Sequence, residues 1–159
     1  MGTPTTKVWK SHETLFTIPV ELVLPFIGIS NRITVKGFHT EVRLKTNLHR
    51  LLPFKNSLVC YGCGKVGEFF AVQRPKNQAG AWELNLYSSG CHLLTCDHLI
   101  PKSKGGENHP SNYGTLCQRC NSRKGSLDLE EFLANRNQHN EWLKQREKES
   151  ATLHGTDSV

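Results

Sequence analysis

The sequence lacks the long apolar segments that membrane and secreted proteins carry. Its longest apolar stretch, Ile18 to Ile29, has 12 residues and contains Glu21 and two prolines, so it is too short and too interrupted to span a bilayer. No continuous apolar segment follows Met1, and we therefore expect no secretory signal. We expect a cytoplasmic protein with no membrane partner, in which cysteines are reduced or bound to metal.

Apolar residues are scarce in general, at 36% of the 159 residues. A chain of this length has room for one compact core with appendages. A core with so few apolar side chains needs a further source of stability, because small domains bury little surface. The six cysteines of the chain are the obvious source.

Acidic residues are few in most of the chain, although the whole chain has a net charge of +6. Residues 1–126 hold 16 Lys and Arg against 7 Asp and Glu, a balance of +9, whereas residues 127–159 hold 4 against 7, a balance of −3. A positive field favours a polyanionic partner, because each phosphate contact releases condensed counterions. A basic surface kept for solubility would give the same composition, so charge alone leaves both interpretations open.

The pattern along the chain predicts a small α+β protein. Apolar and mostly basic side chains alternate on both sides of Gly37, which predicts a hairpin between residues 32 and 45. Strands are expected at 68–73 and 82–87, and a helix with Asp128 as its N-cap is expected after Gly125. The pattern from Ile18 to Phe26 fits neither helix nor strand. The expected divisions are a flexible arm (1–15), a β-rich extension (16–59), a compact core (60–126), a helix (127–148) and a disordered tail (149–159).

Four of the cysteines form two C-x-x-C pairs, Cys60 with Cys63 and Cys117 with Cys120. Each pair can hold a metal through two sulfurs of one turn, and two such pairs make a closed tetrahedral site, which is structural rather than catalytic. We therefore predict a structural zinc ion. A redox pair or free thiols would be the alternative, but neither motif lies in a thioredoxin-like pattern of strands and helices.

Cys91 and Cys96 are left over from these pairs. We expect both to be buried or spare thiols, since free cysteine behaves as a small apolar residue. A zinc site that uses one of them in place of a C-x-x-C cysteine stays open at this point.

The densest motif lies between Cys96 and Gly125. It comprises Asp97-His98, Pro101, Gly105-Gly106, Asn112, Leu116-Cys117-x-x-Cys120, Asn121 and Lys124. In this order and spacing the residues resemble the HNH endonuclease superfamily, in the variant whose last histidine is an asparagine (HNN). The motif from Asp97 to Lys124 is most similar to those of small free-standing prokaryotic or phage proteins of this superfamily. The resemblance implies a ββα-metal core stapled by the structural zinc, with an N-terminal β-rich extension and a C-terminal helix.

The resemblance also implies a role for each polar residue of the motif. His98 would be the general base, because an imidazole can accept a proton from water near neutral pH. Asp97 and Asn121 would hold a catalytic divalent cation, and two oxygen ligands suit Mg²⁺ or Mn²⁺ better than zinc. Asn112 would hold the loop that follows His98, with Asn108 as a competitor for this role. Asn121 could also be a helix N-cap, and the two roles are compatible.

Basic residues crowd the same motif and could contact the phosphates that flank a scissile bond. They are Lys102, Lys104, Arg119, Arg123 and Lys124. The resemblance implies DNA as the partner, and RNA has no specific support. His92, His109 and His139 are set aside, because an isolated histidine is more often a surface residue than a ligand.

A module that binds DNA without cutting it is the main alternative to a nuclease. Simple binding has no need for an acid, a base and an amide ligand grouped as in Asp97, His98 and Asn121, so we favour catalysis. Sequence specificity would come from the hairpin in residues 32–45 or from a partner protein. The biological task and the oligomeric state do not follow from the motif.

Overall fold

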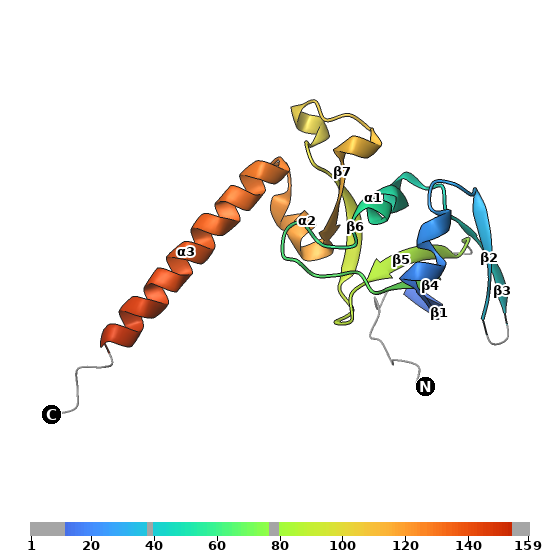
Figure 1. Ribbon diagram of the computed structural model, residues 1–159, viewed down its shortest axis with the longest axis horizontal. Coiled ribbons are helices and arrows are strands. Elements are labelled where there is room, and N and C mark those ends of the chain that lie inside the picture. The colour runs from blue at the N-terminus through green and yellow to red at the C-terminus, as the bar shows by residue number, and fades with distance from the viewer. Residues whose placement is uncertain (1–11, 38–39, 77–79, 154–159) are drawn as a thin grey trace.

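A computed structural model describes residues 12–37, 40–76 and 80–153 of the chain (Figure 1). Helices and strands are mixed, as the α+β prediction required. The strands are β1 (His12–Pro19), β2 (Arg32–Lys36), β3 (Glu41–Lys45), β4 (Phe69–Pro75), β5 (Glu83–Tyr87), β6 (Leu93–His98) and β7 (Tyr113–Cys117). The helices are α1 (Leu52–Asn56), α2 (Gln118–Lys124) and α3 (Leu129–Leu153). Short 3-10 turns are η1 (Val20–Leu22), η2 (Leu24–Phe26), η3 (His49–Leu51), η4 (Lys102–Lys104) and η5 (Pro110–Asn112).

Five of the strands form one antiparallel sheet in the order β1-β4-β5-β6-β7, and β2 and β3 form a separate hairpin. β6 pairs with β5 through only two residue pairs, Leu86 with Leu94 and Tyr87 with Leu93. It pairs with β7 through five, from Leu94 with Cys117 to His98 with Tyr113. The β6–β7 hairpin is therefore attached to the sheet at one end, and its other end, where His98 lies, extends beyond the sheet (Figure 1).

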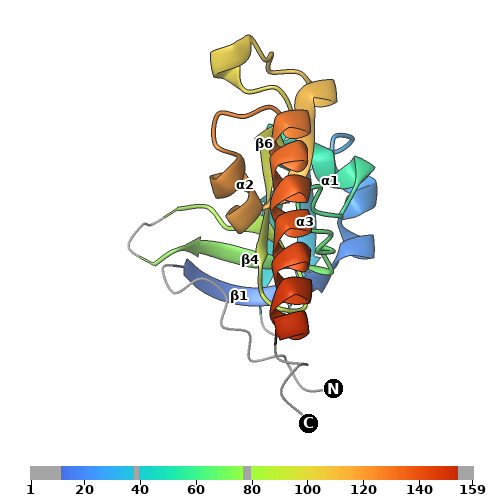
Figure 2. The ribbon, with the colours of Figure 1, turned by 90° about the vertical axis from the view of Figure 1, so that its left-hand side faces the viewer.

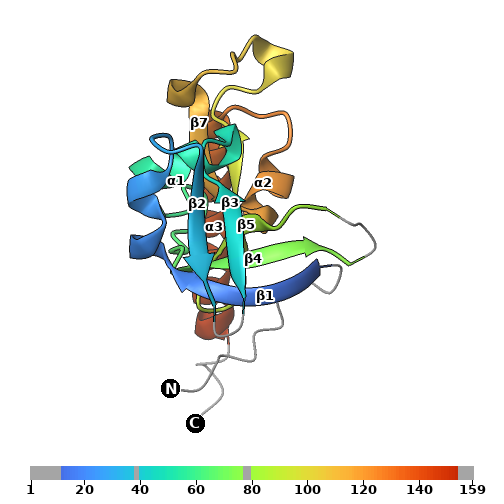
Figure 3. The ribbon, with the colours of Figure 1, turned by 90° about the vertical axis from the view of Figure 1, so that its right-hand side faces the viewer.

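The main core lies between the sheet and the N-terminal part of the chain. α1 and the β2–β3 hairpin cover one face of the sheet (Figure 3), and their apolar residues pack with those of the strands. The Arg50 guanidinium also fastens η3 to β5, because it donates hydrogen bonds to the Leu84 carbonyl and to Asn85 Oδ1. Leu94 of β6 belongs to the same core. Residues 16–59 thus supply more than half of the main core.

A second, smaller core joins the cysteines to the last helix. It consists of Cys60, Leu116, Cys117, Cys120 and Phe132, with Leu127, Leu129 and Leu133 packed against it. The first turns of α3 lie against this core, and the rest of the helix projects away from the body (Figures 1 and 2). Trp142 and Leu143, farther along α3, are 49% and 42% exposed.

Several expected elements are present. The hairpin at 32–45 and the strands near 68–73 and 82–87 are confirmed by β2–β3, β4 and β5, although residues 38–39 and 77–79 lie outside the described residues. Asp128 caps α3 as predicted, since its Oδ1 accepts from the Glu131 N–H while Glu131 accepts from the Asp128 N–H. None of the helices in the described residues has the length and apolar character needed to cross a membrane.

Three segment ends differ from the expectation. β1 begins at His12, within the expected arm, and pairs with β4; residues 1–11 lie outside the described residues. The segment from Ile18 to Phe26 ends β1 and continues as two 3-10 turns. Helix α3 continues to Leu153 and so includes part of the expected tail.

The loop between β6 and β7 is closed by one side chain. Asn112 Oδ1 accepts a hydrogen bond from the Ile100 N–H at 2.8 Å, and its Nδ2 donates to the carbonyls of Ile100 and Glu107. The loop also requires Gly106, because a Cβ there would lie 1.8 Å from the Ile100 carbonyl oxygen. Gly105 has a positive φ of 84° but open space around it. The two adjacent glycines are therefore needed for different reasons.

We predict that Gly106→Ala destabilises the protein more than the adjacent Gly105→Ala. The Gly105 change should cost about 1–2 kcal/mol, because alanine in the left-handed region is strained. The Gly106 change should lower the free energy of unfolding by about 3 kcal/mol, because the backbone of Ile100 must move and the hydrogen bonds of Asn112 weaken. Urea unfolding of both variants measures the difference, and equal losses would contradict this account of the loop.

Candidate functional site

The four cysteines of the two C-x-x-C pairs come together in space. Their sulfur atoms all lie within 4.8 Å of one another, and Cys63 Sγ is 3.6 Å from Cys60 Sγ and 3.7 Å from Cys117 Sγ. A tetrahedral zinc ion with Zn–S bonds of about 2.3 Å would place its sulfurs about 3.8 Å apart. The residues and their spacing therefore fit a zinc ion.

Backbone contacts fix the first pair of cysteines against the second. The turn after Cys60 closes through hydrogen bonds from the Cys60 N–H to the Lys65 carbonyl and from the Gly64 N–H to the Cys60 carbonyl. Cys60 Sγ accepts from the N–H of Cys117 at 3.1 Å. Gly62 packs so closely on α2 that a Cβ there would lie 2.6 Å from Cys120 Sγ. The turn thus sits directly on the junction between β7 and α2.

Crowding of the thiols changes their acidity. Burial raises the pKa of Cys117 and Cys120. Burial acts in the same direction on Cys63, but a backbone hydrogen bond at Lys65 and bonds to the neighbouring sulfurs outweigh it, so the pKa of Cys63 is lowered. The thiol of Cys63 therefore ionises more easily than those of Cys117 and Cys120. A metal that requires all four sulfurs as thiolates would release protons on binding, so its affinity falls with falling pH.

The two remaining cysteines stand apart from the cluster. Among the described residues, the group that could hold a metal consists of the four C-x-x-C cysteines, without Cys91 or Cys96. Cys96 is half-buried, and burial, with a smaller contribution from the charge of Asp97, raises its pKa to about 11. Cys91 is half-buried too. Both are free thiols, as expected.

Asp97 and His98 end β6 and point to opposite sides of it, as consecutive residues on a strand must. Thr95 and Asp97 lie on the side of α2. There Lys124, only 1% exposed, places its Nζ 3.0 Å from Asp97 Oδ2. Neither atom has a hydrogen-bond partner among the described residues, so the ion pair itself compensates for their burial.

Asn121 lies in α2 one turn before Lys124. Its Nδ2 donates to Thr95 Oγ1 at 3.0 Å, and that hydroxyl donates in turn to the Leu116 carbonyl at 2.9 Å. The N-cap of α2 is Cys117, so the interpretation of Asn121 as a helix cap is wrong. Its side chain faces β6, on the same side of the strand as Asp97.

His98 lies on the other side of β6, towards the N-terminal part of the chain. Its Nε2 is 2.9 Å from Asn108 Oδ1, and its ring meets the Tyr113 ring edge-on at 5.1 Å between centroids. Tyr113 is buried and also meets His49 of η3 edge-on, at 6.3 Å. Two asparagines thus share the loop: Asn112 closes it, and Asn108 contacts the imidazole.

The basic residues of the motif divide into two groups. Lys102, Arg119 and Arg123 are exposed. Lys104 is held in ion pairs with Asp128 and Glu131 at the start of α3. Lys124 is buried against Asp97, so its expected contact with a phosphate is replaced by a contact inside the protein.

Sequence reasoning missed Thr95, and it gave Asn108 only as a competitor of Asn112. Thr95 could have been found, because it lies two residues before Asp97 and so shares its face of the strand. The contact of Asn108 with His98 depends on how the loop folds back and has no comparable signal in the spacing.

We predict that Cys60→Ser and Cys120→Ser each lower bound zinc and thermal stability together. Replacing one ligand of a four-thiolate site removes a cross-link between distant parts of the chain, and the folding free energy that metal binding supplies falls with it. Zinc per chain and the melting temperature are measured with Cys91→Ser as the matched control, which should keep both. Unchanged zinc in the Cys60 and Cys120 variants would remove this metal from the account.

Comparisons with known proteins agree with this geometry. The family model for HNH endonuclease matches residues 90–136, less than a third of the chain. Searches of curated proteins and of solved structures find no match. Residues 90–136, which contain β6, β7, α2 and the start of α3, are therefore an HNH endonuclease segment, and this supports a nuclease function for the chain.

Proposed function

We propose that the chain is a metal-dependent endonuclease that hydrolyses DNA phosphodiester bonds. His98 is the general base, and a single Mg²⁺ or Mn²⁺ ion is held by Asp97 and Asn121. The observation that carries the proposal is the hydrogen-bond chain from Asn121 through Thr95 to Leu116, because it determines which atom of the amide is free.

A threonine hydroxyl has one proton to donate. Thr95 gives that proton to the Leu116 carbonyl, so towards Asn121 its oxygen can only accept. The amide must therefore turn its NH₂ group to Thr95, and this leaves Oδ1 without a partner within this chain of bonds. An amide oxygen fixed in this way is a suitable ligand for a hard cation.

Asp97 supplies the second oxygen. Its Oδ2 is buried beside Lys124, which leaves Oδ1 for a cation. Asp97 and Thr95 are two residues apart on one face of β6, a spacing of about 7 Å, so a group hydrogen-bonded to Thr95 and a carboxylate at 97 can share one ion. Lys124 and Thr95 are thus positioning residues, since each orients a ligand rather than touching the substrate.

His98 approaches the same strand end from the other side. With Nε2 donating to Asn108 Oδ1, the neutral imidazole has its lone pair on Nδ1, which is the atom that can accept a proton. The edge-on contact with buried Tyr113 limits rotation of the ring. A phosphate lying across the end of β6 would meet the base on one side and the two ligand oxygens on the other.

Hydrolysis forms a bond from a water oxygen to phosphorus and breaks the bond from phosphorus to O3′. Nδ1 of His98 takes the proton from the attacking water, which makes its oxygen a better nucleophile. A divalent cation held by Asp97 and Asn121 would neutralise charge on the phosphoryl oxygens and on the leaving O3′, which takes its proton from solvent. The chain's own contribution is to hold base and ligands around one phosphate.

Cleavage of supercoiled plasmid tests the proposal. The wild-type protein should nick the plasmid with Mg²⁺ or Mn²⁺ and not without them. His98→Ala should lower the rate by about 10²–10⁴-fold, the usual contribution of a general base, whereas His139→Ala, on the exposed part of α3, should cut normally. Equal cutting by His98→Ala would exclude it as the base. DNA retarded on a gel without cleavage under any metal would favour a binding module.

Thr95 offers a second and more specific prediction. Thr95→Val keeps the shape of the side chain but removes the hydroxyl, so the Asn121 amide loses its orientation, and about 10- to 100-fold more Mg²⁺ should be needed for half-maximal cleavage. Thr95→Ser keeps the hydroxyl and should behave as wild type. An unchanged Mg²⁺ requirement in Thr95→Val would show that the amide is not oriented through this bond.

A further inference from the structure

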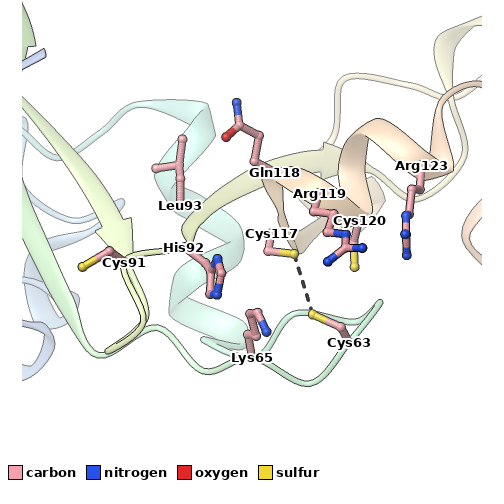
Figure 4. Close-up of a pocket in the computed structure, with 10 residues that line it drawn as sticks. All are labelled: Cys63, Lys65, Cys91, His92, Leu93, Cys117, Gln118, Arg119, Cys120 and Arg123. Atoms are coloured by element: carbon pink, nitrogen blue, oxygen red, sulfur yellow. Dashed lines mark hydrogen bonds between the residues drawn. The ribbon is translucent and has the colours of Figure 1, made fainter. Parts of the chain in front are cut away.

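A cavity of about 430 Å³ lies beside the four-cysteine cluster (Figure 4). Cys63, Cys117 and Cys120 form part of its wall, and basic side chains from three separate segments complete it. These are Lys65 after the first C-x-x-C pair, His92 before β6, and Arg119 and Arg123 on α2. We propose that this cavity binds a DNA backbone phosphate remote from the scissile one. The inference rests on the proposed function for the identity of the polyanion.

The charge of the cavity is not neutralised by the protein. No aspartate or glutamate is among the residues that line it. Elsewhere, Arg50, Arg74, Lys104 and Lys124 each have a carboxylate within 4.0 Å. Within residues 12–37, 40–76 and 80–153, no such ion pair involves the lysine or the two arginines of the cavity. Uncompensated cations that converge on a hollow favour an anionic ligand.

A zinc ion in the neighbouring cluster would not remove this charge. Zn²⁺ with four thiolates carries a net charge of about −2, whereas Lys65, Arg119 and Arg123 together carry three positive charges. Part of the basic lining therefore offsets the metal centre, and the remainder stays available to a ligand. The two arginines can also bind phosphate oxygens through paired N–H groups.

The cavity is placed in line with the proposed reaction centre. Leu93, the first residue of β6, lines the cavity, and His98 ends the strand five residues later, about 16 Å along an extended chain. α2 follows the same direction, because Asn121 contacts Thr95 while Lys124 contacts Asp97. A duplex that lies along β6 and α2 would thus place phosphates at both points, about five base pairs apart at about 3.4 Å per step.

Charge removal at the cavity tests this inference. The dissociation constant for a labelled DNA duplex is measured against salt concentration, without added divalent cation, for the wild type, Lys65→Ala and Arg119→Ala. Lys144→Ala on α3 is the matched control, and zinc per chain is measured in every protein. We expect each cavity variant to bind about fivefold more weakly and to reduce the slope of log affinity against log salt by about 0.9, as loss of one phosphate contact does. Lys65→Arg, which keeps the charge, should bind as the wild type does.

The inference is overturned if the cavity variants keep the wild-type affinity for DNA and the wild-type salt slope. It is also overturned if the variants lose zinc while their affinity for DNA stays unchanged. A loss no larger than that of Lys144→Ala would overturn it as well, because it would reflect net charge alone. A loss of affinity for single-stranded RNA but not for duplex DNA would exclude DNA as the occupant. Plasmid cleavage by the wild type reports separately on the proposed function: weaker binding by the variants without any wild-type cleavage would leave the phosphate site standing and remove the nuclease.

Discussion

The meeting of four cysteine thiols from two distant parts of the chain is the constraint on which the rest of the structure depends. Between Cys63 and Cys117 lie 53 residues, which include β4, β5 and β6. Joining the ends of so long a loop costs chain entropy, and a four-thiolate zinc site would supply that free energy. Because the second pair of cysteines spans the β7–α2 junction, the same contact determines where α2 begins and therefore which of its side chains face β6.

Each face of β6 is covered by a different part of the molecule. α2 covers the side of Asp97, where Lys124 contacts Asp97 and Asn121 contacts Thr95, so both proposed ligands are held in place. The N-terminal part of the chain covers the other side, where His49 reaches Tyr113 and Tyr113 contacts His98. Residues 16–59 lie outside the family match. They nevertheless support Tyr113, the residue that the proposed base His98 contacts.

The sequence was informative where a residue type and its spacing determine the chemistry. Two C-x-x-C pairs predict a closed metal site, and their four sulfur atoms do lie together. The sequence was less informative where tertiary contacts determine the environment of a side chain. Lys124 reads as a surface cation but is buried, because a carboxylate faces it across the helix–strand interface. The contact of Asn108 with His98 depends on a loop whose path no local pattern specifies.

We propose that the chain has two metal sites of different character, a thiolate site that holds the fold together and an oxygen site that serves catalysis. A crystal structure of the zinc-loaded protein soaked in Mn²⁺, with anomalous scattering recorded at both metal edges, tests it most directly. The account predicts zinc among the four cysteine sulfurs and manganese bound by carboxylate and amide oxygens of Asp97 and Asn121. Manganese at the cysteines, or none between these two oxygen ligands, would contradict it.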